Sequence, residues 1–342
     1  MSDAPVLSLR HLRVWYGTPR GPVQAVDDVS LDVAPGEAVG LVGESGCGKS
    51  TLGRAVLGLG TQGAAIDGEV RYQGRDIVGL PTREIRRIRG PEIGLIFQEP
   101  MTRLNPLVTI EDHFRETLKT HEPGLGEKEI KRRSLETLGR TGIPPTRFKQ
   151  YPHEFSGGMR QRITIALALV LRPKLLVADE PTTSLDVLVE AQILRLLNDL
   201  RRDYGTALLL ITHNLGVVAE ACDRMAVMYA GRIAEDGGVR RVFGEPAHPY
   251  TRELLRSTIS LSTKALHHIP GAPPDLVDAP PGCRFHPRCP DAMRVCPQRQ
   301  PRATSPGAGH RVFCWLYAPD AEMPAGGRAR LEKEEFAVAD EA

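Results

Sequence analysis

The sequence predicts an α/β fold, and three observations carry that prediction. Short, wholly apolar runs at 38–42, 175–178 and 207–211 have the length and composition of buried parallel strands. Helix-favouring segments lie between them, so strands and helices alternate over about the first 235 of 342 residues. Two earlier segments, 6–14 and 25–33, alternate apolar and polar residues as half-buried antiparallel strands do.

Charge and hydropathy exclude several classes of protein. The 44 Lys and Arg nearly balance the 42 Asp and Glu, and the lack of a basic excess argues against a protein that binds nucleic acid. The longest apolar run is far shorter than the roughly 18 residues of a membrane helix, and the N-terminus has no secretory pattern. We therefore expect a cytosolic protein that binds no nucleic acid.

A glycine-rich turn joins the apolar run 38–42 to a helix-forming segment at 49–59. It fits G-x-x-x-x-G-K-[ST], in which backbone N–H groups converge on phosphate oxygens. Lys49 would reach the β- and γ-phosphates of a nucleotide, and the Ser50 hydroxyl would bind Mg²⁺. The loop and its expected nucleotide contacts are Gly43, Glu44, Ser45, Gly46, Cys47, Gly48, Lys49, Ser50 and Thr51.

A carboxylate pair, Asp179 and Glu180, ends the apolar run 175–178. Ligand chemistry in an open α/β sheet lies at the carboxyl ends of the strands. We expect Asp179 to hold Mg²⁺ through its water shell. We expect Glu180 to polarise the attacking water as a general base, a role worth about 10² to 10⁴ in rate.

A second glycine-containing helix start lies at Ser156, Gly157 and Gly158, within Phe-Ser-Gly-Gly-Met-Arg-Gln-Arg. Ser156 is suited to an N-cap, and the two glycines leave the helix N-terminus open to an anion. Taken alone, the segment fits an ordinary capped helix as well as a second phosphate-binding site.

Together, these elements resemble the ATP-binding subunit of ABC transporters over about 7–241. The resemblance implies a P-loop NTPase (RecA-like) core with an antiparallel β subdomain and a helical subdomain at about 99–170. It divides the chain into an ATP-binding domain at 1–240 and a C-terminal extension at 241–342. In this family, Ser156 to Gly158 would bind the γ-phosphate of ATP held by the other subunit of a dimer.

The same resemblance implies further roles. Gln98 would contact Mg²⁺ and the membrane partner, and Asp186 would lie at the dimer interface. His213 would contact the γ-phosphate, so the expected catalytic residues are Glu180, His213, Lys49 and Gln98. Tyr16 would stack on adenine, unless the neighbouring Trp15 does so.

Half of the 28 prolines lie between Pro246 and Pro324, and four of the six cysteines fall in the same stretch. Four thiolates can complete a [4Fe–4S] cluster or a tetrahedral zinc site. Structural zinc sites usually contain a cysteine pair two to four residues apart, which is missing here. A cluster, a zinc ion and free thiols in a proline-rich scaffold remain open for these cysteines, which are Cys283, Cys289, Cys296 and Cys314.

The proline-rich extension and Met159 resemble the D-type ATPase of oligopeptide and dipeptide importers, some of which carry an iron–sulfur cluster at these cysteines. The resemblance implies a peripheral protein at the cytoplasmic face of the inner membrane. Its partners would be an F-type second ATPase, two membrane permease subunits and an extracytoplasmic substrate-binding protein.

Nickel chelates, glutathione or oligosaccharides remain alternative cargoes. A soluble ABC ATPase acting on DNA or ribosomes is the competing class. We expect 332–342 to be a flexible acidic tail.

Overall fold

The computed structural model describes residues 4–59, 63–97, 104–182, 186–257 and 268–331. Its larger sheet has eight strands in the order β11-β12-β10-β9-β3-β8-β7-β6. The strands from β9 to β6 pair in parallel, and those from β11 to β9 pair antiparallel. The strands are β3 (Ala38–Val42), β6 (Ile93–Ile96), β7 (Leu175–Asp179), β8 (Ala207–Ile211), β9 (Arg224–Tyr229), β10 (Arg232–Gly238), β11 (Thr304–Gly307) and β12 (His310–Val312).

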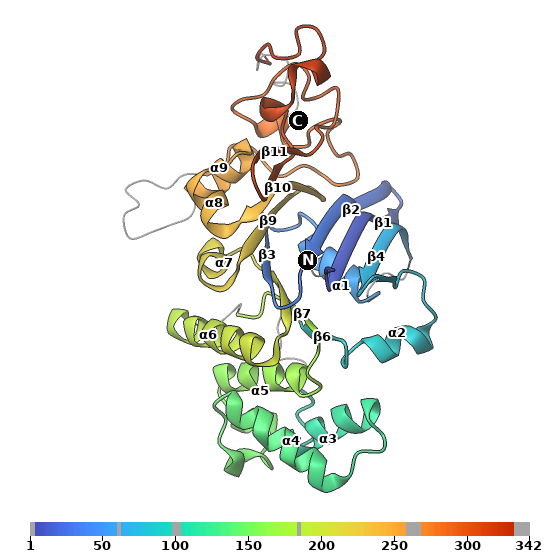
Figure 1. The fold of residues 1–342 in the computed structure, drawn as a ribbon, viewed down its shortest axis with the longest axis vertical. Coiled ribbons are helices and arrows are strands. Elements are labelled where there is room, and N and C mark those ends of the chain that lie inside the picture. Colours follow the sequence, from blue (N-terminus) through green and yellow to red (C-terminus); the bar gives the residue numbers. More distant parts are fainter. Residues whose placement is uncertain (1–3, 60–62, 98–103, 183–185, 258–267, 332–342) are drawn as a thin grey trace.

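The three apolar runs became β3, β7 and β8, and every residue in them is buried. Helices on both sides of the sheet cover these strands, which is why the strands carry no polar face (Figure 1). The α/β prediction is confirmed. The covering and connecting helices of this part are α1 (Lys49–Val56), α2 (Thr82–Ile88), α6 (Val187–Tyr204) and α7 (Leu215–Ala221).

A second, antiparallel sheet has the order β2-β1-β4-β5. Its strands are β1 (Leu7–Thr18), β2 (Gly21–Val33), β4 (Ala64–Tyr72) and β5 (Arg75–Asp76). Side chains of β1, β2, α1 and β7 share one apolar core, so this sheet lies against α1 and the larger sheet. Helix α1 ends before the expected residue 59, because Gly58 adopts a left-handed φ of 60° that stops the helix.

A helical layer lies beyond the β6 edge of the larger sheet (Figure 1). It contains α3 (Ile110–His121), α4 (Glu127–Arg140) and α5 (Gly157–Leu169). These helices pack around a cluster that includes Phe114, Leu138 and Ile163, each of which is fully buried. The layer presents α5 toward α6 and the larger sheet.

The C-terminal residues are mostly coil, with α8 (Val239–Gly244), α9 (Pro249–Arg256) and the hairpin β11–β12. Strand β12 pairs with β10, so the end of the chain completes one edge of the larger sheet. The fully buried Glu235 joins the two parts. Its carboxylate accepts hydrogen bonds from the backbone N–H groups of Ala247 and His248 at 2.8 Å and from His310 Nε2 at 2.7 Å.

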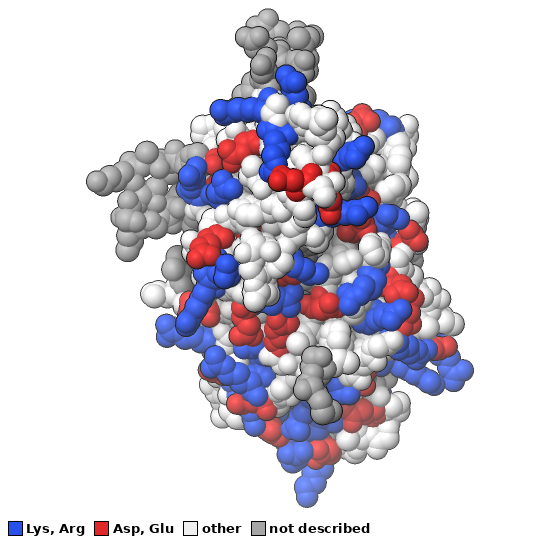
Figure 2. Space-filling model, turned by 45° about the horizontal axis from the view of Figure 1, so that its top comes forward, with Lys and Arg blue, Asp and Glu red and all other residues white. Residues whose placement is uncertain are grey.

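The surface matches the balanced composition. Figure 2 shows Lys and Arg interspersed with Asp and Glu across the face that it displays. Within the described ranges, no helix combines the length and apolar character needed to cross a lipid bilayer.

Candidate nucleotide site

The phosphate loop lies between β3 and α1, in a conformation that requires glycine. Gly43, Gly46 and Gly48 have φ values of 154°, 80° and 104°. A Cβ atom on Gly48 would lie 1.9 Å from the carbonyl oxygen of Ala25. The Lys49 side chain is buried, and its Nζ donates to the carbonyl oxygens of Gly43 at 2.8 Å and Glu44 at 3.0 Å. A cation is therefore fixed inside the loop, as binding of a phosphate requires.

The two expected magnesium ligands meet at the end of β7. Ser50 Oγ, in the first turn of α1, donates to Asp179 Oδ1 at 2.9 Å. Burial raises the pKa of Asp179, and the Ser50 hydrogen bond partly offsets that rise. A hydroxyl and a carboxylate are hard oxygen ligands of the kind that Mg²⁺ prefers, so the pair fits the ion.

Glu180 and His213 lie side by side at the ends of the neighbouring strands β7 and β8. Glu180 Oε1 and His213 Nδ1 are 3.1 Å apart. The glutamate side chain is 14% exposed, and the imidazole is 58% exposed. Glu180 has a left-handed φ of 47°, which a residue with a Cβ adopts only where its surroundings impose it. The structure thus brings together four predicted residues: Ser50, Asp179, Glu180 and His213.

Three other predicted residues lie away from this group. Ser156 caps α5, where its side chain accepts from the backbone N–H of Met159 at 3.4 Å. Gly157 and Gly158 follow at the open start of the helix, and α5 lies in the helical layer rather than beside α1 (Figure 1). The chain does not bring this helix start to its own phosphate loop.

The residues predicted to lie at the dimer interface and at the adenine are in different places. Asp186 is exposed and caps α6 by accepting from the backbone N–H of Val189 at 3.0 Å. Tyr16 lies on β1, half-buried against the core, and Trp15 points to the opposite face of that strand. Gln98 lies outside the described residues.

Comparison with known proteins assigns the family. Residues 26–183 match the model of the ABC transporter family, and residues 234–296 match that of the oligopeptide/dipeptide transporter C-terminal region. The chain is 47% identical over 323 residues to the dipeptide transport ATP-binding protein DppD of Bacillus subtilis, covering 93% of this chain and 96% of the relative. It belongs to the ABC transporter family.

Two more comparisons agree. The oligopeptide transport ATP-binding protein OppD of Salmonella typhimurium is 48% identical over 313 residues, which cover 90% of this chain and 93% of that protein. Among solved structures, the ATP-binding cassette MJ0796, a dimer in a post-hydrolysis state bound to ADP and Pi, has a TM-score of 0.61 at 27% identity. That match covers 68% of this chain and 99% of the cassette. The chain is an ATPase of this family, and the family implies ATP and Mg²⁺.

Sequence reasoning missed two groups that touch the phosphate loop of this ABC ATPase. The Tyr250 hydroxyl accepts a hydrogen bond from the backbone N–H of Glu44 at 3.0 Å. The Arg288 guanidinium pairs with the Glu44 carboxylate through two contacts, of 2.7 and 3.1 Å. Both residues belong to the C-terminal extension, more than 200 positions away, and no local pattern links them to the loop.

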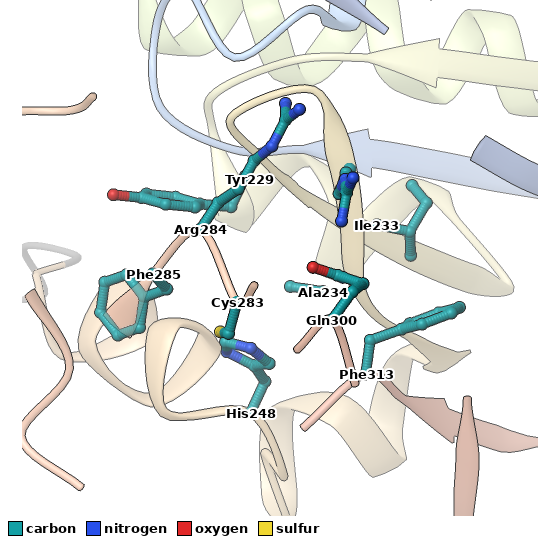
Figure 3. A pocket seen from close by; sticks show the side chains of 10 residues that line it. Tyr229, Ile233, Ala234, His248, Cys283, Arg284, Phe285, Gln300 and Phe313 are labelled. Carbon is teal, nitrogen blue, oxygen red and sulfur yellow. The ribbon is translucent and has the colours of Figure 1, made fainter. Parts of the chain in front are cut away.

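The four cysteines of the extension are free thiols in one neighbourhood. Burial raises the pKa of Cys283, and negative charge on any of the other three would raise it further. Burial likewise raises the pKa of Cys289 and of Cys314 to about 12. Figure 3 shows Cys283 beside His248, at a cavity of about 20 Å³. Among the described residues, no group of three or more His, Cys, Asp or Glu side chains is arranged to hold a metal ion.

Proposed function

We propose that this ATPase powers an importer of oligopeptides or dipeptides. The observation that carries the proposal is the pair of matches in one chain: an ABC transporter cassette followed by the C-terminal region of oligopeptide/dipeptide transporters. Relatives of nearly full length, 44% to 48% identical, carry names of oligopeptide or dipeptide transport proteins. We propose the division of the chain at about residue 240 on the same grounds.

The hydrolytic step follows from the residues around the loop. Lys49 and the loop N–H groups would hold the triphosphate, and Ser50 and Asp179 would hold Mg²⁺, which neutralises phosphate charge. Glu180 would accept a proton from the attacking water as its oxygen bonds to the γ-phosphorus and the bond to the β–γ bridging oxygen breaks. His213, at hydrogen-bond distance from Glu180, would orient that carboxylate and contact the γ-phosphate. We propose that Gln98 adds a further contact to Mg²⁺, and Tyr16 the stacking on adenine.

A second ATPase subunit would complete the site. The helix start at Ser156 lies in the helical layer, away from this chain's own loop, and Asp186 is exposed, so both could reach a partner's nucleotide. In a head-to-tail dimer, each loop would face the other subunit's α5, and closure would be favoured because only the closed form contacts the γ-phosphate from both sides. We propose an F-type subunit as this partner.

The remaining partners follow from importing a peptide across a membrane. We propose two permease subunits, which would dock near 98–107 and the helical layer, and an extracytoplasmic substrate-binding protein. The ATPase would then be peripheral, at the cytoplasmic face of the inner membrane.

Co-expression of the affinity-tagged chain with its candidate permease and ATPase subunits tests the assembly. We expect a detergent-stable complex whose ATP hydrolysis rises when a peptide-loaded binding protein is added. Stimulation by a nickel chelate, glutathione or an oligosaccharide, but by no peptide, would contradict the cargo. Failure to retain any membrane subunit would contradict the importer.

We propose that Cys283, Cys289, Cys296 and Cys314 hold a [4Fe–4S] cluster. The proposal rests on the donor set alone, four free thiols in one extension, because the described side chains are not arranged as metal ligands and would have to move together to bind the cluster. The cluster would act as a staple for a segment that has little apolar core of its own.

Iron and zinc analysis of the purified chain tests this proposal. Changing each of the four cysteines to Ser should lower the bound iron, whereas Cys222→Ser, at a half-buried cysteine outside the extension, should not. Bound zinc would point to the tetrahedral alternative. Iron that survives all four substitutions would contradict the assignment.

A further inference from the structure

Two side chains of the C-terminal extension, Tyr250 and Arg288, bond to Glu44 of the phosphate loop. The Tyr250 hydroxyl accepts from the backbone N–H of Glu44, and the Arg288 guanidinium holds the Glu44 carboxylate in a two-pronged ion pair. The Arg288 side chain is 6% exposed and that of Glu44 is 23% exposed, so water screens the pair only weakly.

Both groups of the extension are fixed in place. Arg288 also donates to the Tyr229 hydroxyl at 3.2 Å and to the carbonyl oxygen of Pro270 at 2.9 Å. Tyr250 is fully buried, with its ring centroid 4.5 Å from that of Tyr229 and 5.3 Å from that of Phe285. Figure 3 shows Tyr229 and Phe285 near each other at the junction of the extension with β9 and β10. The loop is therefore held against a packed aromatic cluster.

Charge explains why such a contact matters to the site. A carboxylate within a loop that binds a triphosphate repels the ligand, and a guanidinium paired with that carboxylate cancels most of the repulsion. The hydroxyl of Tyr250 fixes the backbone at the start of the same loop. Preorganised groups of this kind cost no rearrangement when the ligand binds.

We propose that Arg288 and Tyr250 are positioning residues of the ATP site, and that Arg288 acts by neutralising Glu44. The proposal rests on the proposed ATP site at Gly43 to Thr51. It gives the C-terminal extension a part in nucleotide binding, carried by side chains of this chain alone.

Binding of Mg²⁺–AMP-PNP to the full-length chain, measured by calorimetry, tests the proposal. Arg288→Gln should weaken binding roughly tenfold, because a buried charged hydrogen bond is lost and a carboxylate is left unpaired beside the phosphates. The double variant Arg288→Gln/Glu44→Gln should recover to within about threefold of the wild type, because it carries no unpaired carboxylate. If Arg288 only held the loop in place and did not neutralise Glu44, the double variant would bind the nucleotide as weakly as Arg288→Gln. That result, or unchanged binding by Arg288→Gln, would overturn the proposal.

Further variants separate the causes. Arg288→Lys keeps the charge and should stay within about threefold of the wild type, and Tyr250→Phe should weaken binding by about threefold because it removes one acceptor. The control is Arg20→Gln, which breaks the exposed pair between Arg20 and Asp275 that also joins the extension to the core; binding should not change. Lys49→Ala should abolish binding. If Lys49→Ala binds normally, the proposed ATP site is wrong, whereas normal binding by Arg288→Gln alone refutes only the role of Arg288.

Discussion

At the scale of the residue, Glu180 has an unfavourable left-handed backbone conformation, and it is also the residue that we propose as the general base. Its φ of 47° costs a residue with a Cβ about 1 kcal/mol or more, and the hydrogen bond from its N–H to the carbonyl oxygen of Ile211 at 2.8 Å helps to impose it. The conformation accompanies a carboxylate within 3.1 Å of His213. The left-handed backbone of Glu180 thus lowers the free energy of unfolding at the position where we propose the general base.

Replacing Glu180 should therefore raise stability only when the new residue accepts the left-handed backbone. We expect Glu180→Gly to be about 1 kcal/mol more stable than Glu180→Ala, although both lose the carboxylate and both lose hydrolysis. Urea unfolding of the two variants measures the difference. Equal stability would contradict the account of this backbone.

His248 should make the protein sensitive to acid. Burial, together with the charge of Arg252, lowers its pKa to about 3, so the folded state keeps the ring neutral while the unfolded chain protonates near pH 6.5. The stability gained from a neutral His248 is complete above pH 6.5 and is lost as the pH falls toward 3, by at most about 1.4 kcal/mol per pH unit.

The variant His248→Asn isolates this contribution, because Asn can still cap α9, where His248 Nδ1 now accepts from the Tyr250 N–H. Between pH 7 and pH 5, the wild type should lose about 2 kcal/mol more unfolding free energy than the variant. Parallel pH curves for the two proteins would show that His248 does not titrate as described.

At the scale of the element, the start of α5 is set by close packing on α6. A Cβ atom at Gly158 would lie 2.8 Å from Cγ1 of Val189, whose branched side chain cannot swing away freely. The glycine at the helix start that we propose for phosphate binding therefore also lets the two helices approach.

We expect Gly158→Ala to destabilise the wild-type background by about 1 kcal/mol through overpacking. In a Val189→Ala background the clash is gone, and the same change should stabilise by about 0.5 kcal/mol through helix propensity. Thermal unfolding of the four proteins gives both values. The same sign in both backgrounds would refute the contact.

Strand β10 holds the extension through Glu235, which leads to another prediction. Glu235→Gln leaves at least one buried N–H of Ala247 or His248 without an acceptor, at a cost of about 2 to 3 kcal/mol. The control Arg311→Gln, one position along the β10–β12 pairing, breaks a partly exposed pair with Asp236 and should cost less than about 1 kcal/mol. Limited proteolysis and thermal unfolding should both rank Glu235→Gln as the weaker protein.

Residue patterns within a short stretch of sequence predicted the elements whose structure depends only on that stretch. Strands β3, β7 and β8 were predictable because strands buried on both faces must be wholly apolar. The meeting of Ser50 with Asp179 was predictable because both follow strands whose carboxyl ends share one edge of the sheet. The hairpin β11–β12 was not, since its residues, with Pro306 and Gly309, have the composition of a loop and gain their partner only through pairing with β10.

At the scale of the whole molecule, the extension and the cassette share structure that the sequence keeps far apart. Strand β12 continues the larger sheet, Glu235 is bonded to His310, and Glu44 is bonded to Tyr250 and Arg288. These contacts join positions 75 to 244 residues apart, and periodicity along the chain carries no information on them. The proline-rich C-terminal extension therefore contacts both the larger sheet and the phosphate loop.

We propose that this chain hydrolyses ATP to drive peptide import, with Glu180 as the base. The most direct test reconstitutes the full complex in proteoliposomes and measures peptide uptake together with ATP hydrolysis, for the wild type and for Glu180→Gln. We predict peptide uptake that depends on ATP in the wild type, and a loss of both activities by a factor of about 10² or more in the variant, while nucleotide still binds. Uptake and hydrolysis that persist in Glu180→Gln, or hydrolysis that no peptide stimulates, would contradict the account.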